Sequence, residues 1–331
     1  MKLPQVISIG EALIDRLGPP EGDPDLVHLM KDCFGGAPAN VACALSRFGV
    51  KVAFIGSLGD DSFGRQFKNL MIERGINIDG LQTDNLRPTR IVLVKRNLDG
   101  DRSFGGFVGN KGSGFADQAL SWEQINKNWP LLTEKTKWLI VGSIPLSSRN
   151  SSEAFSKCVE NALSIGIDIA FDLNWRPTFW RNEISTESAP SQEEKNRINF
   201  LLDKVRLIKL AKEEAEWFFD SVNPAKISQS LPQRPSVIVT DGSNPVSWIL
   251  NQNCGYSTAI SPPLVVDTTG AGDAFTAGLI YKLLSLDLDK INQQESENII
   301  KFAIGCGAHV CQFEGAIKSQ PYIEDVEKLL S

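Results

Sequence analysis

Short apolar runs of strand length alternate with amphipathic stretches along nearly the whole chain. The apolar runs cover residues 5–13, 51–59, 137–143, 167–174, 205–210, 236–242, 246–250 and 264–268. Apolar residues recur at helical spacing in the stretches 39–49, 63–74 and 299–310. Because strands that alternate with helices favour parallel pairing, the pattern predicts an α/β fold with a mostly parallel sheet covered by helices.

One region departs from this alternation. Two runs of alternating apolar and polar residues flank Asp99-Gly100, a dipeptide typical of tight β-hairpin turns. Residues 16–34 look extended and rich in turns. We therefore expect segments 16–34 and 87–108 to form a small β layer on a single domain that spans residues 1–331. The layer is either a lid over a site or an ordinary edge hairpin.

Composition and charge exclude several classes of protein. The 331 residues carry a formal net charge of −6, and no block of Lys and Arg is long enough to form a basic stripe. The chain has no apolar run of about 18 residues and no signal-peptide pattern at its start. Two histidines and six cysteines without metal-binding spacing argue against a His-rich metal centre or a Ser-His-Asp hydrolase. We expect a cytoplasmic protein that acts on a small molecule and binds neither nucleic acid nor membranes.

The segment VVDTTGAGDAFTAGLI, residues 265–280, combines a glycine turn, the start of an apolar helix and a carboxylate. The two glycines bring backbone N–H groups to one point, where the helix start favours an anion. A dinucleotide-binding loop would have a third glycine at Phe275, and a Walker A loop would have Gly-Lys-Ser/Thr, which the chain lacks. The remaining interpretation is phosphoryl transfer, in which the amides hold the migrating phosphate and Asp273 takes the proton of the acceptor hydroxyl.

The charge of Asp273 is part of this interpretation. We expect the helix start to lower the pKa of its carboxyl group, so that it is ionised at neutral pH. The alternative is an ordinary helix N-terminus, in which the glycines turn the chain and Asp273 complements the helix dipole. The preceding apolar run, the two threonines and the small residues of the helix favour the first interpretation.

The same segment resembles the carboxy-terminal signature of the ribokinase-like, or PfkB, family of sugar kinases, and GGAPANVACALSRFG at 35–49 resembles its amino-terminal signature. Shorter blocks agree in order, closest to the fructokinase branch: GEALID at 10–15, the hairpin 89–104, GSIPL at 142–146, DLNWRPTFW at 172–180, VTDG at 239–242 and FAIGCGAHV at 302–310. The resemblance implies a ribokinase-like three-layer α/β/α domain with a small β-sheet lid. It also implies transfer of the γ-phosphoryl group of Mg·ATP to the primary hydroxyl of fructose.

The resemblance assigns roles in catalysis and sugar binding to individual residues. Asp273 would be the base, and Arg176 would neutralise charge on the phosphoryl oxygens. The backbone of the glycine turn would form the anion hole, at Gly270, Ala271 and Gly272. The sugar would contact residues from three segments, namely Asp15, Gly35, Gly36, Asn40 and Asn110. Taken alone, the two adjacent glycines also fit a loop turn, Asn40 a helix cap and Arg176 a surface salt bridge.

The resemblance also implies nucleotide and metal contacts. Those to ATP would come from Asn174 near the phosphates, from Thr240 and Gly242 on the triphosphate loop, and from Phe302 and Cys306 beside the adenine. Helix packing explains the last two equally well. Glu214 occupies the acidic position of an Asn-x-x-Glu element that organises Mg²⁺ through water, but Ala211 stands at the Asn position, and a solvated helix glutamate is the alternative. Asp267 and Thr269 match part of a monovalent-cation loop, which implies K⁺.

Three blocks differ from the fructokinase pattern. After the hairpin, Gly109 and Lys111 replace an arginine and a proline, Leu173 replaces a proline, and Asn244-Pro245 replaces a glycine pair. The first two differences concern the sugar end, so 2-keto-3-deoxygluconate kinase, ribokinase and nucleoside kinase stay open as alternatives. Outside this class, the alternatives are a non-catalytic sugar-sensing relative and a dehydrogenase. Exposed strand edges of the lid would allow a homodimer.

Overall fold

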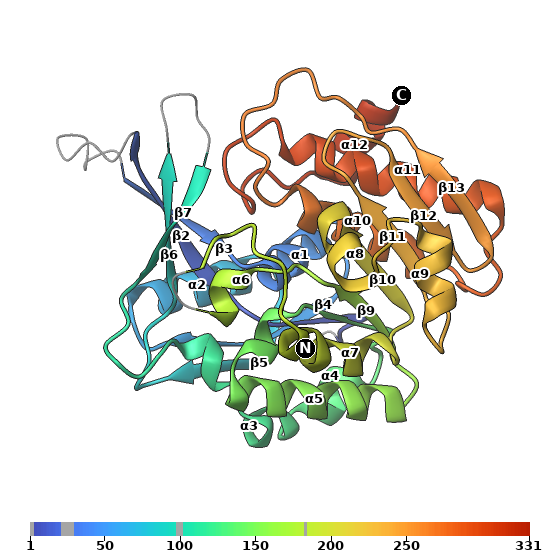
Figure 1. The fold of residues 1–331 in the computed structure, drawn as a ribbon. Helices are drawn as coiled ribbons and strands as arrows, with labels where there is room; N and C mark the ends of the chain where they lie inside the picture. Colours follow the sequence, from blue (N-terminus) through green and yellow to red (C-terminus); the bar gives the residue numbers. More distant parts are fainter. Residues whose placement is uncertain (1–2, 21–29, 97–101, 182–183) are drawn as a thin grey trace.

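The structure is a computed structural model that describes residues 3–20, 30–96, 102–181 and 184–331. Nine strands form the large sheet, in the order β13-β12-β11-β10-β9-β8-β1-β4-β5 (Figure 1). Their bounds are β1 Val6–Ile9, β4 Val52–Gly59, β5 Asn77–Asp84, β8 Trp138–Val141, β9 Asp168–Asp172, β10 Leu207–Ala211, β11 Ser236–Thr240, β12 Val246–Leu250 and β13 Asn253–Ser257. Neighbouring strands run parallel from β5 to β11, whereas β12 and β13 pair antiparallel at one edge. The predicted mostly parallel sheet is confirmed.

Helices cover both faces of the large sheet. One buried cluster receives side chains from α1 Ala37–Arg47, α2 Ser62–Glu73, α10 Ala271–Leu283, α11 Gln293–Val310 and α12 Ile323–Leu330. The other receives them from α3 Trp122–Asn126, α4 Trp129–Thr133, α5 Arg149–Ser164, α7 Gln192–Leu202, α8 Lys212–Phe219 and α9 Pro224–Ser230. Because helices cover both faces, central strands are apolar on both sides, and every residue of β4 is buried. In the described ranges, no helix is long and apolar enough to cross a membrane.

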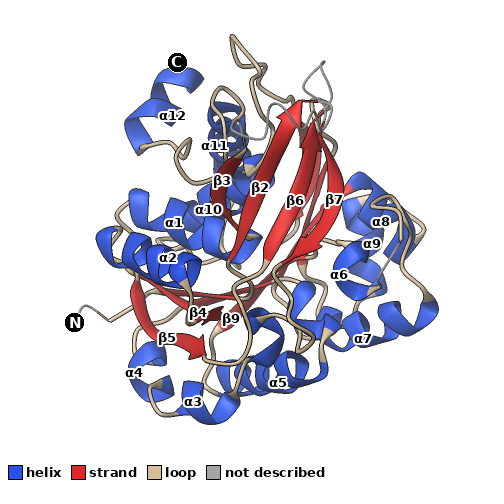
Figure 2. Ribbon diagram, turned by 90° about the vertical axis from the view of Figure 1, so that its left-hand side faces the viewer, coloured by secondary structure: helices blue, strands red, loops and turns tan. Residues whose placement is uncertain are grey.

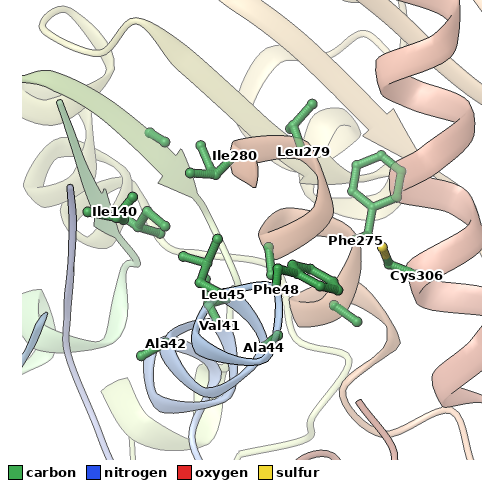
Figure 3. Close-up of a cluster of buried hydrophobic side chains, with 14 of the residues drawn as sticks. Val41, Ala42, Ala44, Leu45, Phe48, Ile140, Phe275, Leu279, Ile280 and Cys306 are labelled. Atoms are coloured by element: carbon green, nitrogen blue, oxygen red, sulfur yellow. The ribbon is translucent and has the colours of Figure 1, made fainter. Parts of the chain in front are cut away.

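The close packing of α1 on α10 forms the centre of the first cluster. Leu45 of α1 and Phe48, which directly follows this helix, share the cluster with Leu279 and Ile280 of α10, and the ring of Phe48 lies 5.3 Å from that of Tyr281. The sulfur of Cys306 on α11 points toward the α10 side chains (Figure 3). These contacts fix the two helices that begin at the two glycine-rich signatures. The starting points of α1 and α10 are therefore held at a set distance from each other.

A second sheet of four strands, called here the small sheet, stands apart from the large one (Figure 2). Its order is β3-β2-β6-β7, with bounds β2 Leu13–Pro20, β3 Lys31–Gly35, β6 Ile91–Arg96 and β7 Arg102–Val108. Phe34 on β3 packs edge-on against Phe67 on α2, with ring centroids 4.9 Å apart, so the small sheet rests on the body. The predicted small β layer is confirmed. The predicted turn at Asp99-Gly100 and residues 21–29 lie outside the described residues.

One strand assignment from the sequence was wrong, and two strands were missed. Residues 264–268 are not a strand: the side chains of Leu264, Val265 and Val266 are exposed, and the amides of Val266 and Asp267 donate to the carbonyl of Cys311 at the end of α11. The apolar run covers the end of a helix instead of entering the sheet. The strands β5 and β13, the two edges of the large sheet, were not predicted. Edge strands need fewer apolar residues, and these two mix polar and apolar residues.

Candidate active site

Several of the predicted site residues lie at or just beyond the carboxyl ends of the parallel strands, among them Asn174, Arg176 and Thr240. Strand β1 lies between β4 and β8, so the chain proceeds toward one edge of the sheet and later toward the other. In open α/β sheets, ligands bind beyond the strand ends at such a reversal of strand order. The helices α1 and α10 both begin here, and α10 follows the segment whose amides hold the end of α11.

A hydrogen bond between the two signatures defines the site. Asn40 Nδ2 donates to Asp273 Oδ2 at 2.7 Å, across 233 positions of sequence. Asn40 is 4% exposed, and its Oδ1 is buried and accepts no hydrogen bond within the described part of the chain. A buried amide oxygen without a donor costs about 1–3 kcal/mol. A bound hydroxyl beside Asp273 would supply the missing donor.

The pKa of Asp273 contradicts the sequence-based expectation. Burial raises the pKa of its carboxyl group from 3.8 to about 6, and the nearby Asp172 charge raises it further. The hydrogen bond from Asn40 and the charges of Lys209 and Arg176 lower the pKa without reversing the shift. The expected lowering was wrong because loss of solvation outweighs the favourable field of the helix start. With a pKa of about 6, the carboxylate is still mostly ionised at neutral pH and is a better proton acceptor than an exposed aspartate.

The glycine turn before α10 has the geometry of an anion site. Gly270 has φ 83°, and a Cβ there would lie 2.5 Å from Ala316 Cβ, so no other residue fits without rearrangement. The amide of Ala271 donates to the carbonyl of Thr268 at 3.2 Å, so it closes the turn. The amides of Gly272 and Asp273 belong to the first helical turn and have no intrahelical acceptor. Of the amides in the predicted anion hole, the N–H group of Gly272 is thus available to a ligand.

The predicted sugar residues lie on both sides of the junction between the two sheets. Asp15 lies on β2, and its Oδ2 occupies the space that a Cβ at Gly35 would need. Gly36 has φ 100°, and a Cβ there would lie 2.6 Å from the carbonyl oxygen of Glu11. These contacts explain both glycines. Asn110, by contrast, is exposed, and its Oδ1 accepts hydrogen bonds from the amides of two glycines in its own loop.

Asn174 and Arg176 follow the end of β9. Asn174 has φ 45°, a left-handed conformation that is strained for a residue with a side chain and common at functional sites. Arg176 is exposed, and its charge acts on Asp273. Among the described residues Arg176 forms no ion pair, which removes the surface salt bridge as its explanation.

The other predicted nucleotide residues differ in exposure. Thr240 ends β11 and its hydroxyl donates to the carbonyl of Leu210, while Gly242, with φ 55°, forms the turn that follows. Phe302 and Cys306 are 2% and 0% exposed. Phe302 stacks near Phe48 and Tyr281, and Cys306 lies between α10 and α11 (Figure 3). Helix packing, the stated alternative, explains these two buried residues.

The predicted cation residues are used in backbone contacts. Glu214 is 5% exposed, which rules out the solvated alternative, and its two oxygens accept from the amides of Trp175 (2.6 Å) and Ala211 (2.7 Å). Burial raises the pKa of Glu214. Asp267 is 6% exposed and accepts from the amides of Thr269 and Gly315 at 3.0 and 2.8 Å. Within the described ranges, no group of three His, Cys, Asp or Glu residues is placed to hold a metal.

A buried ion pair beside the glycine turn was not predicted from the sequence. Lys209 Nζ lies 3.1 and 3.2 Å from the two carboxylate oxygens of Asp172, and the Thr276 hydroxyl donates to the same carboxylate at 2.7 Å. One signal was present in the sequence: VRLIKL and IDIAFD each carry a charged residue inside or at the end of an apolar strand. Lys and Asp are rarely buried unless paired.

Comparison with known proteins agrees with this geometry. Residues 3–323 match the family described as pfkB family carbohydrate kinase. A fructokinase of Vibrio alginolyticus is 32% identical over 321 residues, which cover 96% of both chains. The crystal structure of a Xylella fastidiosa fructokinase with bound ATP superposes with a TM-score of 0.83 at 27% identity, covering 99% of this chain and 98% of the other. A Vibrio cholerae fructokinase bound to fructose, ADP and calcium gives a TM-score of 0.81 at 26% identity, covering 99% of each chain.

The sheet order, the paired helix starts and the carboxylate at the glycine turn define a sugar phosphotransferase with a ribokinase-like three-layer α/β/α fold. The chain belongs to the pfkB family of carbohydrate kinases. The resemblance found in the two signatures is confirmed, and the dehydrogenase alternative is excluded.

Proposed function

We propose that this enzyme is an ATP-dependent fructokinase that forms fructose 6-phosphate and ADP. The single observation that supports it most is the contact of Asn40 with Asp273, in which a buried amide oxygen lacks a donor beside a carboxylate base. A primary hydroxyl placed there donates either to Asn40 Oδ1 or to Asp273. The names of the relatives support fructose as the sugar, and two solved relatives carry ATP or fructose with ADP.

The reaction follows from the positions of these groups. The hydroxyl oxygen attacks the γ-phosphorus, the O–P bond to the β-phosphate breaks, and the hydroxyl proton passes to Asp273 Oδ. The amide of Gly272, which the turn at Gly270 and Ala271 presents, and the guanidinium of Arg176 would stabilise the charge on the phosphoryl oxygens. Asp15, Gly35 and Gly36 would hold the other hydroxyls of the sugar, with Asn110 closing over it.

Mg²⁺, when bound with ATP, would supply positive charge that offsets the charge of the phosphates. Because the described residues offer no ready set of metal ligands, the phosphates and water would supply most of them, with Glu214 acting through water. Asp267 and Thr269 would form the monovalent-cation site for K⁺. Asn174, Thr240 and Gly242 would contact the phosphates of the nucleotide, with Phe302 and Cys306 behind the adenine.

The small sheet would act as a lid over the sugar. Asp15 lies on it, whereas Asp273 lies on the body, so the two halves of the site belong to different sheets. Closure would exclude water, which otherwise competes with the sugar as acceptor. The outer strands β3 and β7 are edges of the small sheet, and their pairing with a second subunit would give a homodimer. With ATP as the donor, the location that we propose for the enzyme is the cytoplasm.

The first test removes the base. Asp273→Asn keeps the size of the side chain and an acceptor for Asn40 Nδ2, so we expect near-normal sugar and ATP affinity and turnover reduced by roughly 10²–10⁴. Binding is measured by calorimetry and turnover by ADP release. Retention of wild-type turnover would assign proton removal to another group.

The second test identifies the acceptor. ADP release is compared across fructose, glucose, ribose, 2-keto-3-deoxygluconate and adenosine, with kcat/KM highest for fructose. A higher value for another acceptor would replace fructose and leave the phosphoryl-transfer mechanism in place. Normal sugar binding without ADP release in the wild-type protein would instead indicate the sugar-sensing alternative.

A further inference from the structure

We propose that Lys209 is a further catalytic residue, which contacts the migrating phosphoryl group, and that Asp172 is the positioning residue that holds it there. The proposal rests on the phosphoryl-transfer function given above. It assigns a function to the buried ion pair on the strands β9 and β10, which was not predicted from the sequence.

The register of the sheet places the pair under the start of α10. Lys209 and Asp172 are direct partners in the parallel pairing of β10 with β9, so their side chains leave the same face of the sheet. Leu207 and Ala170, two residues earlier on each strand, belong to the buried cluster that also contains α10. Both charged residues therefore point toward α10 at the carboxyl ends of their strands.

The ammonium group of Lys209 lies at the predicted anion hole. A Cβ at Gly272 would be only 3.1 Å from Lys209 Nζ, and Gly272 itself is exposed. The lysine side chain is 13% exposed, so a small opening leads from its surroundings to solvent. An ammonium carries three donors, and Asp172 faces two of them. An oxygen of the phosphoryl group held at the amide of Gly272 would lie within reach of the third.

Asp172 orients this lysine and connects it to the helix. Its carboxylate is 9% exposed and accepts from both Lys209 and the Thr276 hydroxyl, one turn into α10. The start of α10 and the ammonium group are thus fixed to the same carboxylate. A buried ion pair adds little to stability compared with apolar residues of equal size, so stability alone gives little reason for one at this position.

The charge of Lys209 also reaches the base. Lys209 lowers the pKa of Asp273, while burial and Asp172 raise it. Burial lowers the pKa of Lys209, but the charges of Asp172, Glu214 and Asp273 outweigh it, so the pKa lies above its ordinary value and the lysine stays protonated. Arg176 is the other cation that acts on Asp273, from the exposed rim of the site. Lys209 would contact the transferring group from the buried side of the site, and Arg176 from the exposed rim.

The test uses the neutral double variant Lys209→Met with Asp172→Asn, because Lys209→Met alone leaves a buried carboxylate without its partner. The amide oxygen introduced by Asp172→Asn keeps an acceptor for the Thr276 hydroxyl. We expect kcat to fall by roughly 10²–10³, with the KM values for fructose and ATP within a few-fold of wild type. The acid limb of the pH profile of kcat/KM should move to lower pH, because the variant removes the Asp172 charge, which raises the pKa of Asp273, together with the weaker opposing charge of Lys209.

A binding measurement separates catalysis from folding. With fructose present, the wild-type enzyme should bind ADP with aluminium fluoride, a mimic of the migrating phosphoryl group, more tightly than ADP alone. The double variant should lose most of this difference and keep its affinity for ADP. Arg206→Met removes a cation from the other end of β10, where Arg206 pairs with Asp289, and should change neither measurement.

The outcomes distinguish this proposal from the proposed function. If Asp273→Asn loses turnover but the double variant keeps wild-type kcat, pH profile and binding of the mimic, Lys209 is structural only and this proposal is wrong. If the wild-type enzyme releases no ADP with any sugar, the proposed function itself fails.

Discussion

At the scale of single residues, the site is dominated by carboxyl groups whose burial changes their ionisation. Glu11 is 3% exposed, and its Oε1 accepts a hydrogen bond from the amide of Ala37 at the start of α1. Burial raises its pKa from 4.5 to about 8, and the charges of Asp117 and Asp273 raise it further. Glu11 is therefore protonated at neutral pH, whereas Asp273, with a pKa of about 6, is mostly ionised. Environment, more than residue type, gives these two acids different states.

The ionisation of Glu11 predicts how stability depends on pH. Its folded pKa of about 8 lies above the ordinary 4.5, so between these values the folded state holds a proton that the unfolded state lacks. The free energy of unfolding should fall as pH rises through this window, by at most about 1.4 kcal/mol per pH unit from this group. Glu11→Gln keeps the acceptor for Ala37 and does not titrate. At pH 8 it should be more stable than wild type by about 2–4 kcal/mol.

Urea unfolding at pH 5, 6, 7 and 8 measures this effect. The wild-type protein and Glu11→Gln should converge toward pH 5 and diverge toward pH 8. Parallel profiles would show that Glu11 is ionised in the folded protein.

At the scale of elements, the position at which α10 begins decides the geometry of the site. Gly270, the residue directly before α10, has a left-handed backbone and lies against Ala316. The helix can therefore begin at this point only if residue 270 has no side chain. The first turn of α10 then presents Gly272 to Lys209 and Asp273 to Asn40. A shift in the start of this helix would separate Asp273, the proposed base, from Asn40 on α1.

Gly270→Ala tests this dependence. The added methyl group contacts Ala316 in a disfavoured backbone conformation, so we expect turnover to fall by more than about 10² because catalytic geometry is sensitive to displacements of about 1 Å. Stability should fall by about 1–3 kcal/mol. Gly49→Ala is the matched control: Gly49 has φ 79° at the end of α1 but open space around its Cβ position.

The control should lose only about 1–2 kcal/mol and retain its turnover. Steady-state kinetics and thermal unfolding of both variants measure the two effects. Equal turnover in both variants would mean that backbone strain alone, without contact to Ala316, is the reason that position 270 requires glycine.

At the scale of the whole molecule, a buried arginine connects the small sheet to the body. Arg90 precedes β6 and pairs with Asp117 at 3.0 Å, with side chains 3% and 5% exposed. Its guanidinium lies 4.4–4.7 Å from the ring centroids of Phe107 on β7, Phe115 before the 3₁₀ helix Ala116–Ala119, and Phe179 on α6 Pro177–Trp180. The small sheet, the body and the segment that follows Arg176 therefore meet at one side chain.

Arg90→Met should destabilise the protein by about 3–5 kcal/mol, because it leaves the carboxylate of Asp117 buried without a partner. Asp117→Asn in the same background should recover part of this loss. Chemical denaturation of the two single variants and the double variant gives the coupling energy. Additive effects would show that the two side chains do not stabilise each other.

Much of the fold could be predicted from the sequence, because the spacing of apolar residues within a short segment indicates which of its faces is buried. Central strands such as β4 and β8 are buried on both faces and read as continuous apolar runs, and the apolar residues of α11 recur at helical spacing and are buried. The errors occurred where burial and apolar character differ. The run 264–268 is apolar but exposed, while the edge strands β5 and β13 are paired but partly polar.

The sequence by itself determined the class of the fold, the two signatures and the candidate base Asp273, because glycine turns, helix starts and strand runs depend on neighbouring residues. Only the tertiary structure decided that Asn40 contacts Asp273, that Lys209 and Asp172 lie below Gly272, and that Asp273 has a raised pKa. Each of these depends on side chains that approach one another from distant segments, and on the solvent that their packing excludes. Local sequence patterns carry no measure of either quantity.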